Sequence, residues 1–423
     1  MLDINFIRGN VEIVKEAARK KRIKVDVDKL INIDEKRRKL LGEVEEIRNK
    51  RNIIAKSIGT LSPEKRQEAI SQGKELKQSL EGLEPELKEY ENQINDIMLM
   101  VPGIPHPSVP EGVSDEDNVE LRKVGEIPEF DFELKDHIEL AHSLDIVDFE
   151  RASKFAGGRS YLLKNEGALL EQAICRYVVE HIIKKGFSYH HVPVLVKDIA
   201  MFGTGFFPLG VEDTYRMEKD ELNLVGTSEV SLVSTRLNEI LSEDELPLRF
   251  VGLSPCFRRE AGSYGKDTKG FYRVHQFTKV EQVVISKNCI EGSEKEHNFI
   301  LNNAEEIMQA LKLPYRVALA CTGEIGLGQV MKHEIETWMP SRNFYCETHS
   351  CSTLHEFQAR RLNIRYRDKE GKIRFVHTLN NTAIASPRIL IPILEMNQQK
   401  DGSVVVPEVL RPYMMGIEVI EPK

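Results

Sequence analysis

The sequence predicts an α+β protein in which an N-terminal antiparallel coiled-coil hairpin of helices precedes a mixed, mostly antiparallel β-sheet flanked by helices. One observation is a pair of apolar series with a 3.5-residue period, separated by a short break near residue 60. The other is a proline-rich connection after residue 100, beyond which strand-like and helix-like segments alternate. We therefore expect a helical domain at residues 1–110 and a sheet domain at residues 111–423.

Length and composition limit the class of protein. With 423 residues, of which 41% are hydrophobic and 30% charged, the chain has room for two or three domains and a large core. The net charge of -8 argues against a uniformly basic surface, so any RNA contact must be a local cluster of Lys and Arg. No long apolar run predicts a transmembrane helix, and the start lacks the layout of a secretory signal. Six scattered cysteines fit a reducing cytoplasm.

The spacing of apolar residues predicts the hairpin. The first series alternates three and four residues apart, with Arg37 and Arg51 filling its gaps, and comprises Leu30, Ile33, Leu40, Val44, Ile47, Ile54 and Ile58. Gly59 to Pro63 ends this helix, and Pro63 suits the first turn of the next one. The second series comprises Leu76, Leu80, Leu83, Leu87, Tyr90, Ile94 and Ile97. Two such helices form a hairpin on the order of 45 Å long.

Basic residues occupy outer positions of the first helix, at Lys36, Arg38, Lys39, Arg48 and Lys50. Charge on a coiled coil is by default a solvated face with helix ion pairs, here to Glu43, Glu45 and Glu46. The alternative is a stripe that contacts the backbone of an RNA. Composition alone favours the solvated face.

The connection after the hairpin spans residues 101–125, where four prolines and an acidic run interrupt regular structure. Beyond it, the pattern predicts a helix over 170–185 and a strand over 189–196 centred on Pro193. Further strands are predicted over 223–225, 250–257, 273–285 and 372–377. These segments supply the predicted sheet and its flanking helices.

The most informative segment runs from Phe257 to Glu281. It places Arg258 beside Glu260, then a loop containing glycines, then a strand-like run that ends at Glu281. A guanidinium presents a planar fork of donors to phosphate and carboxylate oxygens, and glycine lets the backbone approach a bulky ligand. An isolated Arg-Arg-Glu is usually a surface ion pair. Here it is accompanied, in order, by Gly262, Asp267, Thr268, Gly270, His275, Gln276 and Phe277.

This order resembles motif 2 of class II aminoacyl-tRNA synthetases, in the form found in seryl-tRNA synthetases. The resemblance covers essentially the whole chain, from the hairpin to Tyr413. It implies that Arg258 is the catalytic residue and holds both the amino-acid carboxylate and the α-phosphate of ATP. Arg259 and Glu260 would also bind ATP, and Phe277 would cover one face of its adenine.

Two further segments match motifs of the same family. Pro193 resembles the motif 1 proline at the dimer interface, although alone it reads as an ordinary strand-edge proline. Residues 378–388 resemble motif 3, whose arginine, here Arg388, packs on the other face of adenine. The segment after it, from Glu395 to Gly402, continues the pattern.

The segment from Glu347 to Ser352 resembles the family's ATP and metal site. The resemblance implies that Glu347 and Ser350 bind the Mg²⁺ of ATP through hard oxygen ligands, with Thr348 and His349 beside the nucleotide. A rival interpretation is a zinc site, because four soft ligands lie within ten residues, at Cys346, His349, Cys351 and His355. Their spacing matches no common structural zinc pattern.

The resemblance also implies a pocket for the amino acid. Thr227, Ser228 and Glu229 resemble a Thr-Ala-Glu loop that contacts L-serine in the family. With Arg258, Glu281 and Thr382 they would recognise a small amino acid that bears a hydroxyl. A site that hydrogen-bonds a hydroxyl rejects analogues lacking it far better than an apolar pocket does.

Several positions depart from the family pattern. Motif 3 usually reads Asn-Gly-Ser-Gly, whereas this chain has Asn381, Ala383 and Pro387 in place of glycines. Pro387 suits the first turn of the following helix, and Pro392 is expected to kink it further in. Other departures are Ser352 to Leu354, Phe206 to Leu209, Glu324 and His333.

The resemblance as a whole implies a cytoplasmic homodimer that joins serine to tRNA(Ser) with ATP and Mg²⁺. It favours the RNA stripe over the solvated face, because the family's hairpin grips the long variable arm of its tRNA. One alternative is a paralogue that activates serine or another small amino acid outside translation. The other is a catalytically silent RNA-binding scaffold, against which the retained Arg258, Glu281, Glu347 and Arg388 argue.

Overall fold

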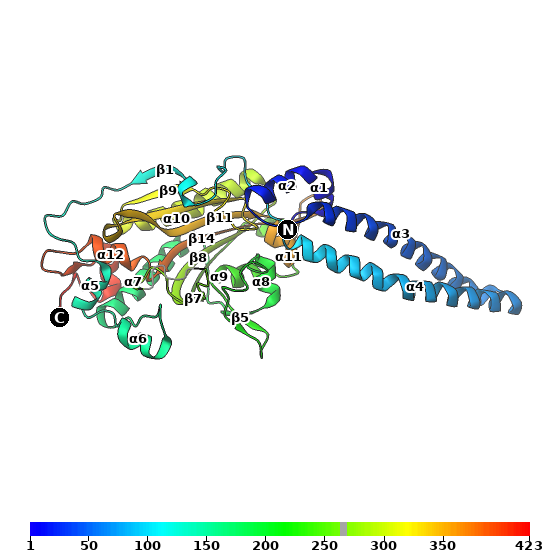
Figure 1. Cartoon of the computed structure of the whole chain (residues 1–423), viewed down its shortest axis with the longest axis horizontal. Helices are drawn as coiled ribbons and strands as arrows, with labels where there is room; N and C mark the ends of the chain where they lie inside the picture. The colour runs from blue at the N-terminus through cyan, green and yellow to red at the C-terminus, as the bar shows by residue number, and fades with distance from the viewer. Residues whose placement is uncertain (263–268) are drawn as a thin grey trace. The chain divides into compact units, whose positions relative to one another are not determined.

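The computed structural model describes residues 1–262 and 269–423. Within it the chain forms two compact units: one comprises Leu2–Pro102, and the other comprises Gly103–Lys423 together with Met1. Among the described residues, no helix is long and apolar enough to cross a membrane. Figure 1 traces the helices and strands of both units along the chain.

The first unit contains the predicted hairpin, which is confirmed. Its elements are α1 (Ile4–Gly9), α2 (Val11–Lys20), α3 (Val27–Ser57), the short η1 (Ile58–Thr60) and α4 (Pro63–Met98). Pro63 is the first residue of α4, where its missing N–H costs no helical bond. Where α3 and α4 pack, the buried core is formed by Leu40, Val44, Leu80 and Leu87.

The second unit is built on an eight-stranded sheet in the order β1-β9-β10-β11-β14-β8-β7-β2. All neighbouring strands are antiparallel except β2 and β7, which are parallel. In sheet order, the strands are β1 (Val119–Val124), β9 (Tyr315–Leu319), β10 (Met331–Met339), β11 (Phe344–His355), β14 (His377–Ser386), β8 (Gln276–Ser286), β7 (Leu248–Phe257) and β2 (Ser188–His190). The predicted mixed, mostly antiparallel sheet is therefore confirmed.

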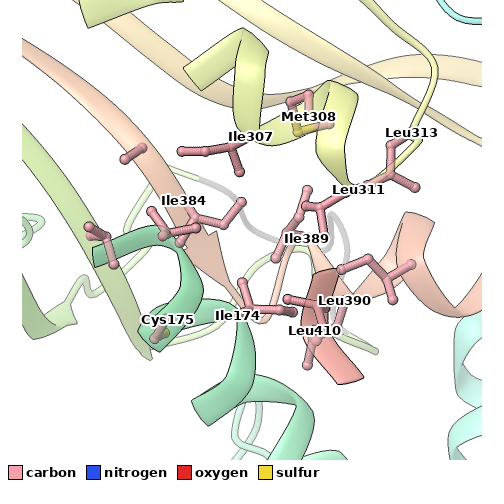
Figure 2. Close-up of a cluster of buried hydrophobic side chains, with 14 of the residues drawn as sticks. Ile174, Cys175, Ile307, Met308, Leu311, Leu313, Ile384, Ile389, Leu390 and Leu410 are labelled. Carbon is pink, nitrogen blue, oxygen red and sulfur yellow. The ribbon is translucent and has the colours of Figure 1, made fainter. Parts of the chain in front are cut away.

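Helices cover both faces of this sheet. The helices α7 (Asn165–Lys184) and α10 (Ile290–Ala310) pack on one face, over the main apolar core. Figure 2 shows part of this core, with side chains of both helices facing Ile384 of β14 and Leu390. On the other face, α9 (Ser228–Ser234) and α11 (Phe357–Leu362) enclose a second core.

Shorter elements complete the unit. The remaining helices are α5 (His137–Ser143), α6 (Phe149–Ala156), α8 (Asp198–Thr204), α12 (Leu390–Met396), η2 (Asp115–Asp117), η3 (Glu243–Glu245), η4 (Pro340–Arg342) and η5 (Glu408–Met414). The remaining strands form three small sheets: β13 (Ile373–Phe375), β12 (Arg365–Arg367) and β6 (Ile240–Ser242); β3 (Leu195–Lys197), β5 (Leu222–Leu224) and β4 (Arg216–Met217); and β15 (Val404–Val405) with β16 (Val419–Ile420).

Three local predictions are wrong, all at prolines. The strand predicted over 189–196 is two strands, because β2 pairs with β7 and β3 pairs with β5, with Pro193 between them. A proline donates no hydrogen bond to a ladder, so the chain changes partners there. The helix after motif 3 begins only at Leu390, so Pro387 precedes the helix and is not in its first turn. Pro392 lies in the first turn instead and breaks no helical bond. The predicted kink therefore has no physical cause.

Other predicted boundaries differ by a few residues. The helix predicted over 170–185 begins at Asn165, before its first large apolar residue. The strand predicted over 372–377 divides into β13 and the start of β14, which belong to different sheets. Hydrophobic pattern identifies these elements, but hydrogen-bond partners set their ends.

Candidate active site

A cavity in the second unit collects most of the predicted site residues. Its walls come from β8, β11 and β14 and from the segments that follow β7 and β14. The predicted residues in its lining are Arg258, Glu260, Phe277, Glu347, Thr348, His349, Ser350, Thr382 and Arg388. Segments far apart in the sequence therefore meet in one place.

The sheet is irregular at the level of this cavity. Strand β11 shifts its register against β10 between Glu347 and His349, and β14 shifts against β8 after Thr382. The ladder between β11 and β14 ends at the pair Cys351 and Asn381. Bulges re-aim side chains and are common beside active sites. Beyond that last pair, both strands line the cavity.

Arg258 enters the cavity at the end of β7. Its backbone N–H donates to the carbonyl oxygen of His275 at 3.0 Å, which fixes the start of the turn. Its guanidinium lies over the ring of Phe277, 5.3 Å from the ring centroid. Among the described residues, no side chain or carbonyl accepts a hydrogen bond from this guanidinium. Its donors are therefore available to a ligand's oxyanions.

Arg388, which also lines the cavity, is held by several contacts. Its Nε and Nη2 donate to the carbonyl oxygen of Tyr272, each at 3.3 Å, and its Nη1 donates to that of Glu347 at 3.0 Å. The guanidinium lies 4.5 Å from the centroid of the Tyr272 ring. These contacts set the plane of a cation that can stack on a flat ligand.

Glu347 and Ser350 fit a hard cation such as Mg²⁺. Burial raises the pKa of the Glu347 carboxyl, but the positive charges of Arg388, Lys332 and Arg258 outweigh it and hold that pKa below its usual value. The group therefore stays a carboxylate at neutral pH. The Ser350 hydroxyl has no hydrogen-bond partner among the described residues, and both side chains line the cavity. Carboxylate and hydroxyl oxygens are ligands that Mg²⁺ accepts.

Thr348 and His349 form the buried wall between those two residues. The Thr348 hydroxyl lies 2.7 Å from that of Thr337 and 2.8 Å from Nδ1 of His349. Burial lowers the pKa of His349 to about 4, so its imidazole is neutral at physiological pH.

A second group of polar residues lies deeper on the same face of β8. Thr382 faces Glu281 across the ladder, and its hydroxyl donates to Glu281 Oε2 at 3.4 Å. The same carboxylate oxygen lies 2.5 Å from Nζ of Lys279, and this ion pair is almost completely buried. Glu281 and Lys279 share one face because residues two apart along a strand point the same way.

Glu229 stands next to this group. Its Oε1 accepts from the side-chain amides of Gln358 at 2.7 Å and Asn380 at 2.9 Å. Burial, reinforced by the nearby charge of Glu281, raises the pKa of Glu229 to about 7. Glu229 therefore changes its charge near neutral pH, unlike an ordinary glutamate.

Five predicted residues lie outside the cavity lining: Glu229 and Glu281 of the deeper polar group, and Thr227, Ser228 and Arg259. Thr227 caps α9, where its hydroxyl accepts from the backbone N–H of Glu229 at 3.2 Å, and Ser228 is fully buried. Arg259 is exposed, and its backbone N–H donates to the carbonyl oxygen of Asp213 at 2.9 Å. Asp267 and Thr268 of the predicted motif 2 lie outside the described residues.

The four residues of the zinc interpretation do not converge. All lie on β11, but Cys351 contacts His297 at 3.8 Å and His355 stacks on His377 with ring centroids 4.6 Å apart. His349 faces Thr348 instead. Within residues 1–262 and 269–423, no group of three or more His, Cys, Asp or Glu is placed to hold a metal ion.

Sequence analysis missed four residues of this region: Tyr272, Lys279, Gln358 and Asn380. The sequence could have indicated Lys279, because it lies two residues before Glu281 in a predicted strand and so shares its face. No sequence pattern indicates Gln358, since it reaches Glu229 from a helix that is distant in sequence.

Two family models match the chain. The seryl-tRNA synthetase N-terminal domain matches residues 1–105, which include the whole hairpin. The tRNA synthetase class II core domain (G, H, P, S and T) matches residues 211–397, which include every residue of the cavity lining. The fold and the cavity thus define a class II aminoacyl-tRNA synthetase.

Relatives of known name match over the full length. The serine–tRNA ligase of Deinococcus radiodurans is 48% identical over 420 residues, covering 99% of each chain. The seryl-tRNA synthetase from Pyrococcus horikoshii, solved in complex with ATP, is 39% identical with a TM-score of 0.91 and covers 100% of each chain. The Naegleria fowleri cytoplasmic serine–tRNA ligase, solved with AMP, is 30% identical with a TM-score of 0.88 and covers 100% of this chain and 99% of its own.

This chain belongs to the seryl-tRNA synthetase family. Its activity is the ATP-dependent ligation of serine to tRNA, as predicted.

Proposed function

We propose that the cavity joins the carboxylate of L-serine to the α-phosphate of ATP, and that each group lining it has a defined role. A serine carboxylate oxygen attacks the α-phosphorus, the bond to the β-phosphate oxygen breaks, and pyrophosphate leaves. A hydroxyl at the 3′ end of tRNA then attacks the activated carbonyl and releases AMP. The observation that carries the proposal is Arg258, whose guanidinium lines the cavity without a hydrogen-bond partner among the described residues.

Arg258 is the catalytic residue of this proposal. Its fork of donors binds a carboxylate oxygen and an α-phosphate oxygen together, which aligns the attack. The same charge offsets the negative charge that grows at phosphorus in the transition state. Because the group already lies over Phe277, little reorganisation accompanies binding.

In this proposal the adenine of the nucleotide lies between Phe277 and Arg388. Phe277 and the Arg388 guanidinium take opposite faces of adenine, while Glu260, with Arg259 beside it, contacts the nucleotide near the motif 2 turn. Glu347 and Ser350 would hold Mg²⁺, and Thr348 and His349 line the cavity between them. When bound, the ion offsets phosphate charge and favours departure of pyrophosphate. The ATP complex of the Pyrococcus horikoshii relative supports a nucleotide in this fold.

Serine occupies the deeper polar group. Glu281 and Thr382 bracket its hydroxyl, and Glu229 faces its ammonium, with Thr227 and Ser228 fixing the first turn of α9, which carries Glu229. Lys279 balances the charge of Glu281 when the pocket is empty. The pocket therefore binds most tightly an amino acid that places a hydroxyl and a positive charge at these positions.

The hairpin is the RNA-binding arm of this proposal. Lys36, Arg38, Lys39 and Lys50 are all exposed and have no ion-pair partner among the described residues, whereas Arg48 pairs with Glu84 at 2.8 Å. The helix ion pairs to Glu43, Glu45 and Glu46 do not form in the described chain, so these cations remain available to phosphates. We assign the arm to a domain at residues 1–110 and catalysis to residues 111–423.

Two further features belong to the same proposal. The chain acts as a homodimer through the region of Pro193 and β2, which is an edge strand of the main sheet with Tyr189 exposed. An exposed edge strand is a ready surface for a second copy. We also assign the protein to the cytoplasm, where its tRNA substrate is charged.

Amino-acid selection tests the proposal. Among the twenty amino acids, serine is expected to support ATP–pyrophosphate exchange best. A second assay then measures the charging of total tRNA with serine. Thr382→Val replaces a hydroxyl with a methyl at nearly constant volume and leaves Glu281 without one partner. The serine-to-alanine ratio of kcat/KM should therefore fall by roughly 5- to 150-fold, equivalent to roughly 1–3 kcal/mol, while the KM for ATP stays unchanged. An unchanged ratio, with or without lower stability, would remove Thr382 from the pocket.

The charge of Glu229 predicts a pH dependence for serine binding. Its pKa is raised to about 7, so the carboxylate is mostly neutral at pH 6 and mostly charged at pH 8. Binding of the serine ammonium should tighten as pH rises through this range, and the KM for serine should fall by about tenfold. Glu229→Gln should abolish this dependence, while the pH profile of the KM for ATP serves as the control. A serine KM that is flat with pH in the native protein would contradict the role of Glu229.

A further inference from the structure

Asn381 occupies the point at which two strands of the active site separate. It forms the last pair of the β11–β14 ladder, opposite Cys351. The next residues of β14 and the preceding residues of β11 line the cavity, among them Thr382 and Ser350. The Asn381 side chain therefore lies where the backbone pairing of the two strands ends.

The Asn381 side chain bridges the two strands. Its Nδ2 donates to the carbonyl oxygen of Ser350 at 3.1 Å. Its Oδ1 accepts from Nε2 of Gln282 on β8 at 2.6 Å, and Gln282 Nε2 also donates to the carbonyl oxygen of Ile300 in α10 at 3.1 Å. Finally, Asn303 of α10 donates from Nδ2 to Gln282 Oε1 at 2.8 Å.

These three amides form one buried chain, since Gln282, Asn303 and Asn381 are each 0% exposed. A buried amide is fixed in orientation because turning it would leave donors and acceptors unpaired. The chain crosses the sheet from α10 to β11, so it ties Ser350 to a helix on the opposite face. A glycine at position 381 has no side chain with which to make this tie.

We propose that Asn381 is a positioning residue for the metal and phosphate side of the active site, anchored by Gln282 and Asn303. It fixes the backbone of Ser350 where β11 leaves β14, and thereby sets where the Ser350 hydroxyl stands relative to Glu347. This inference rests on the proposed role of Ser350 as a ligand of Mg²⁺. It assigns Asn381 no contact with the substrate.

The test measures how much Mg²⁺ strengthens ATP binding. ATP affinity is determined calorimetrically on the full chain, once in EDTA and once in excess Mg²⁺. Asn381→Ala should bind ATP in EDTA within about twofold of the native protein, but its gain in affinity from Mg²⁺ should be about tenfold smaller. The KM for serine should change by less than threefold. An equal Mg²⁺ gain in both proteins would overturn the proposal.

Hydrogen exchange supplies a readout that needs neither ligand nor activity. In the free protein, Asn381→Ala should speed exchange of the amides of residues 347–350 relative to the rest of β11. Leu379→Ala is the matched control, because Leu379 lies on the same strand and is buried in the apolar core. The control should lower the melting temperature without changing either the Mg²⁺ gain or local exchange at 347–350. Equal acceleration in both variants would make Asn381 merely structural and would overturn the proposal.

Gln282→Met keeps the test decisive if Asn381→Ala folds poorly. It removes the anchor of the Asn381 amide at nearly constant volume, so it should reduce the Mg²⁺ gain by a smaller factor. The double variant should lose no more than Asn381→Ala alone, because the two residues act as one chain. If the two substitutions reduced the Mg²⁺ gain independently and additively, the linked amides of Gln282 and Asn381 would not be the cause.

Ser350→Ala separates this inference from the proposed function. Loss of the Mg²⁺ gain in Ser350→Ala with a normal gain in Asn381→Ala would overturn the positioning role and leave the metal site standing. A normal Mg²⁺ gain in Ser350→Ala would overturn the metal ligand itself and, with it, the role assigned here to Asn381. Reduced gains in both variants support both.

Discussion

Arg258→Lys is expected to lower the rate of serine-dependent ATP–pyrophosphate exchange by about 10²–10³-fold. Lysine keeps the positive charge but presents no planar fork, so it cannot hold a carboxylate and a phosphate oxygen in one fixed geometry. The melting temperature should not change, because the guanidinium makes no hydrogen bond to any described residue. Exchange rates and thermal unfolding of the same preparation measure the two effects.

The control for this substitution is Arg176→Lys. Arg176 is largely exposed on α7 and pairs with Glu180. Arg176→Lys makes the same chemical change at a residue that does not line the cavity, so exchange should remain at the native level. If Arg258→Lys shows near-native exchange, Arg258 does not act at the reacting phosphate, and the assignment of the catalytic residue fails.

Replacing residues 35–96 with a short Gly-Ser turn should lower kcat/KM for tRNA charging by about 10³-fold, the scale on which specific nucleic-acid binding exceeds non-specific binding. The deletion removes the five outer basic residues Lys36, Arg38, Lys39, Arg48 and Lys50. It also removes the whole hairpin core of Leu40, Val44, Leu80 and Leu87. Serine-dependent exchange should stay within about twofold of native, because the remaining unit keeps its own core. The two assays on one protein separate RNA binding from catalysis.

A charge variant distinguishes RNA contact from loss of the arm. Changing Lys36, Arg38, Lys39 and Lys50 to glutamine keeps the hairpin seam and removes only exposed cations. It should raise the KM for tRNA and flatten its dependence on salt, since fewer counterions are released on binding. If the deletion abolished exchange and charging equally, the hairpin would support the catalytic unit rather than bind RNA.

Much of the fold is predictable because its elements carry strong local periods. The hairpin follows from residues such as Leu40 and Leu80, whose spacing admits one seam. The ends of elements are less predictable, because they depend on partners distant in sequence. Pro193 shows this: the pattern reads through it, but the flanking residues pair with different strands.

The site residues also differ in how far the sequence predicts them. Arg258, Glu347 and Arg388 lie in motifs whose order is visible in the chain, and the structure brings them into one cavity. Gln358 and Gln282 act through hydrogen bonds to residues about 100 or more positions away, with no motif to indicate them. In the sequence, Asn381 stands out only because the family motif has a glycine there. Its hydrogen bond to Ser350 depends on where the pairing of β11 and β14 ends.

The regular seam of the hairpin gives the arm an adjustable reach. Seven residues added to each helix would lengthen it by about 10 Å and keep the cations facing the same way. An addition of three or four residues to each helix would instead turn the outer part of the arm about its axis and point those cations elsewhere. The reach of the hairpin can therefore vary in whole heptads, at constant direction, without altering Leu40 or Val44. If the hairpin binds RNA as proposed, its length in whole heptads sets how far its cations reach.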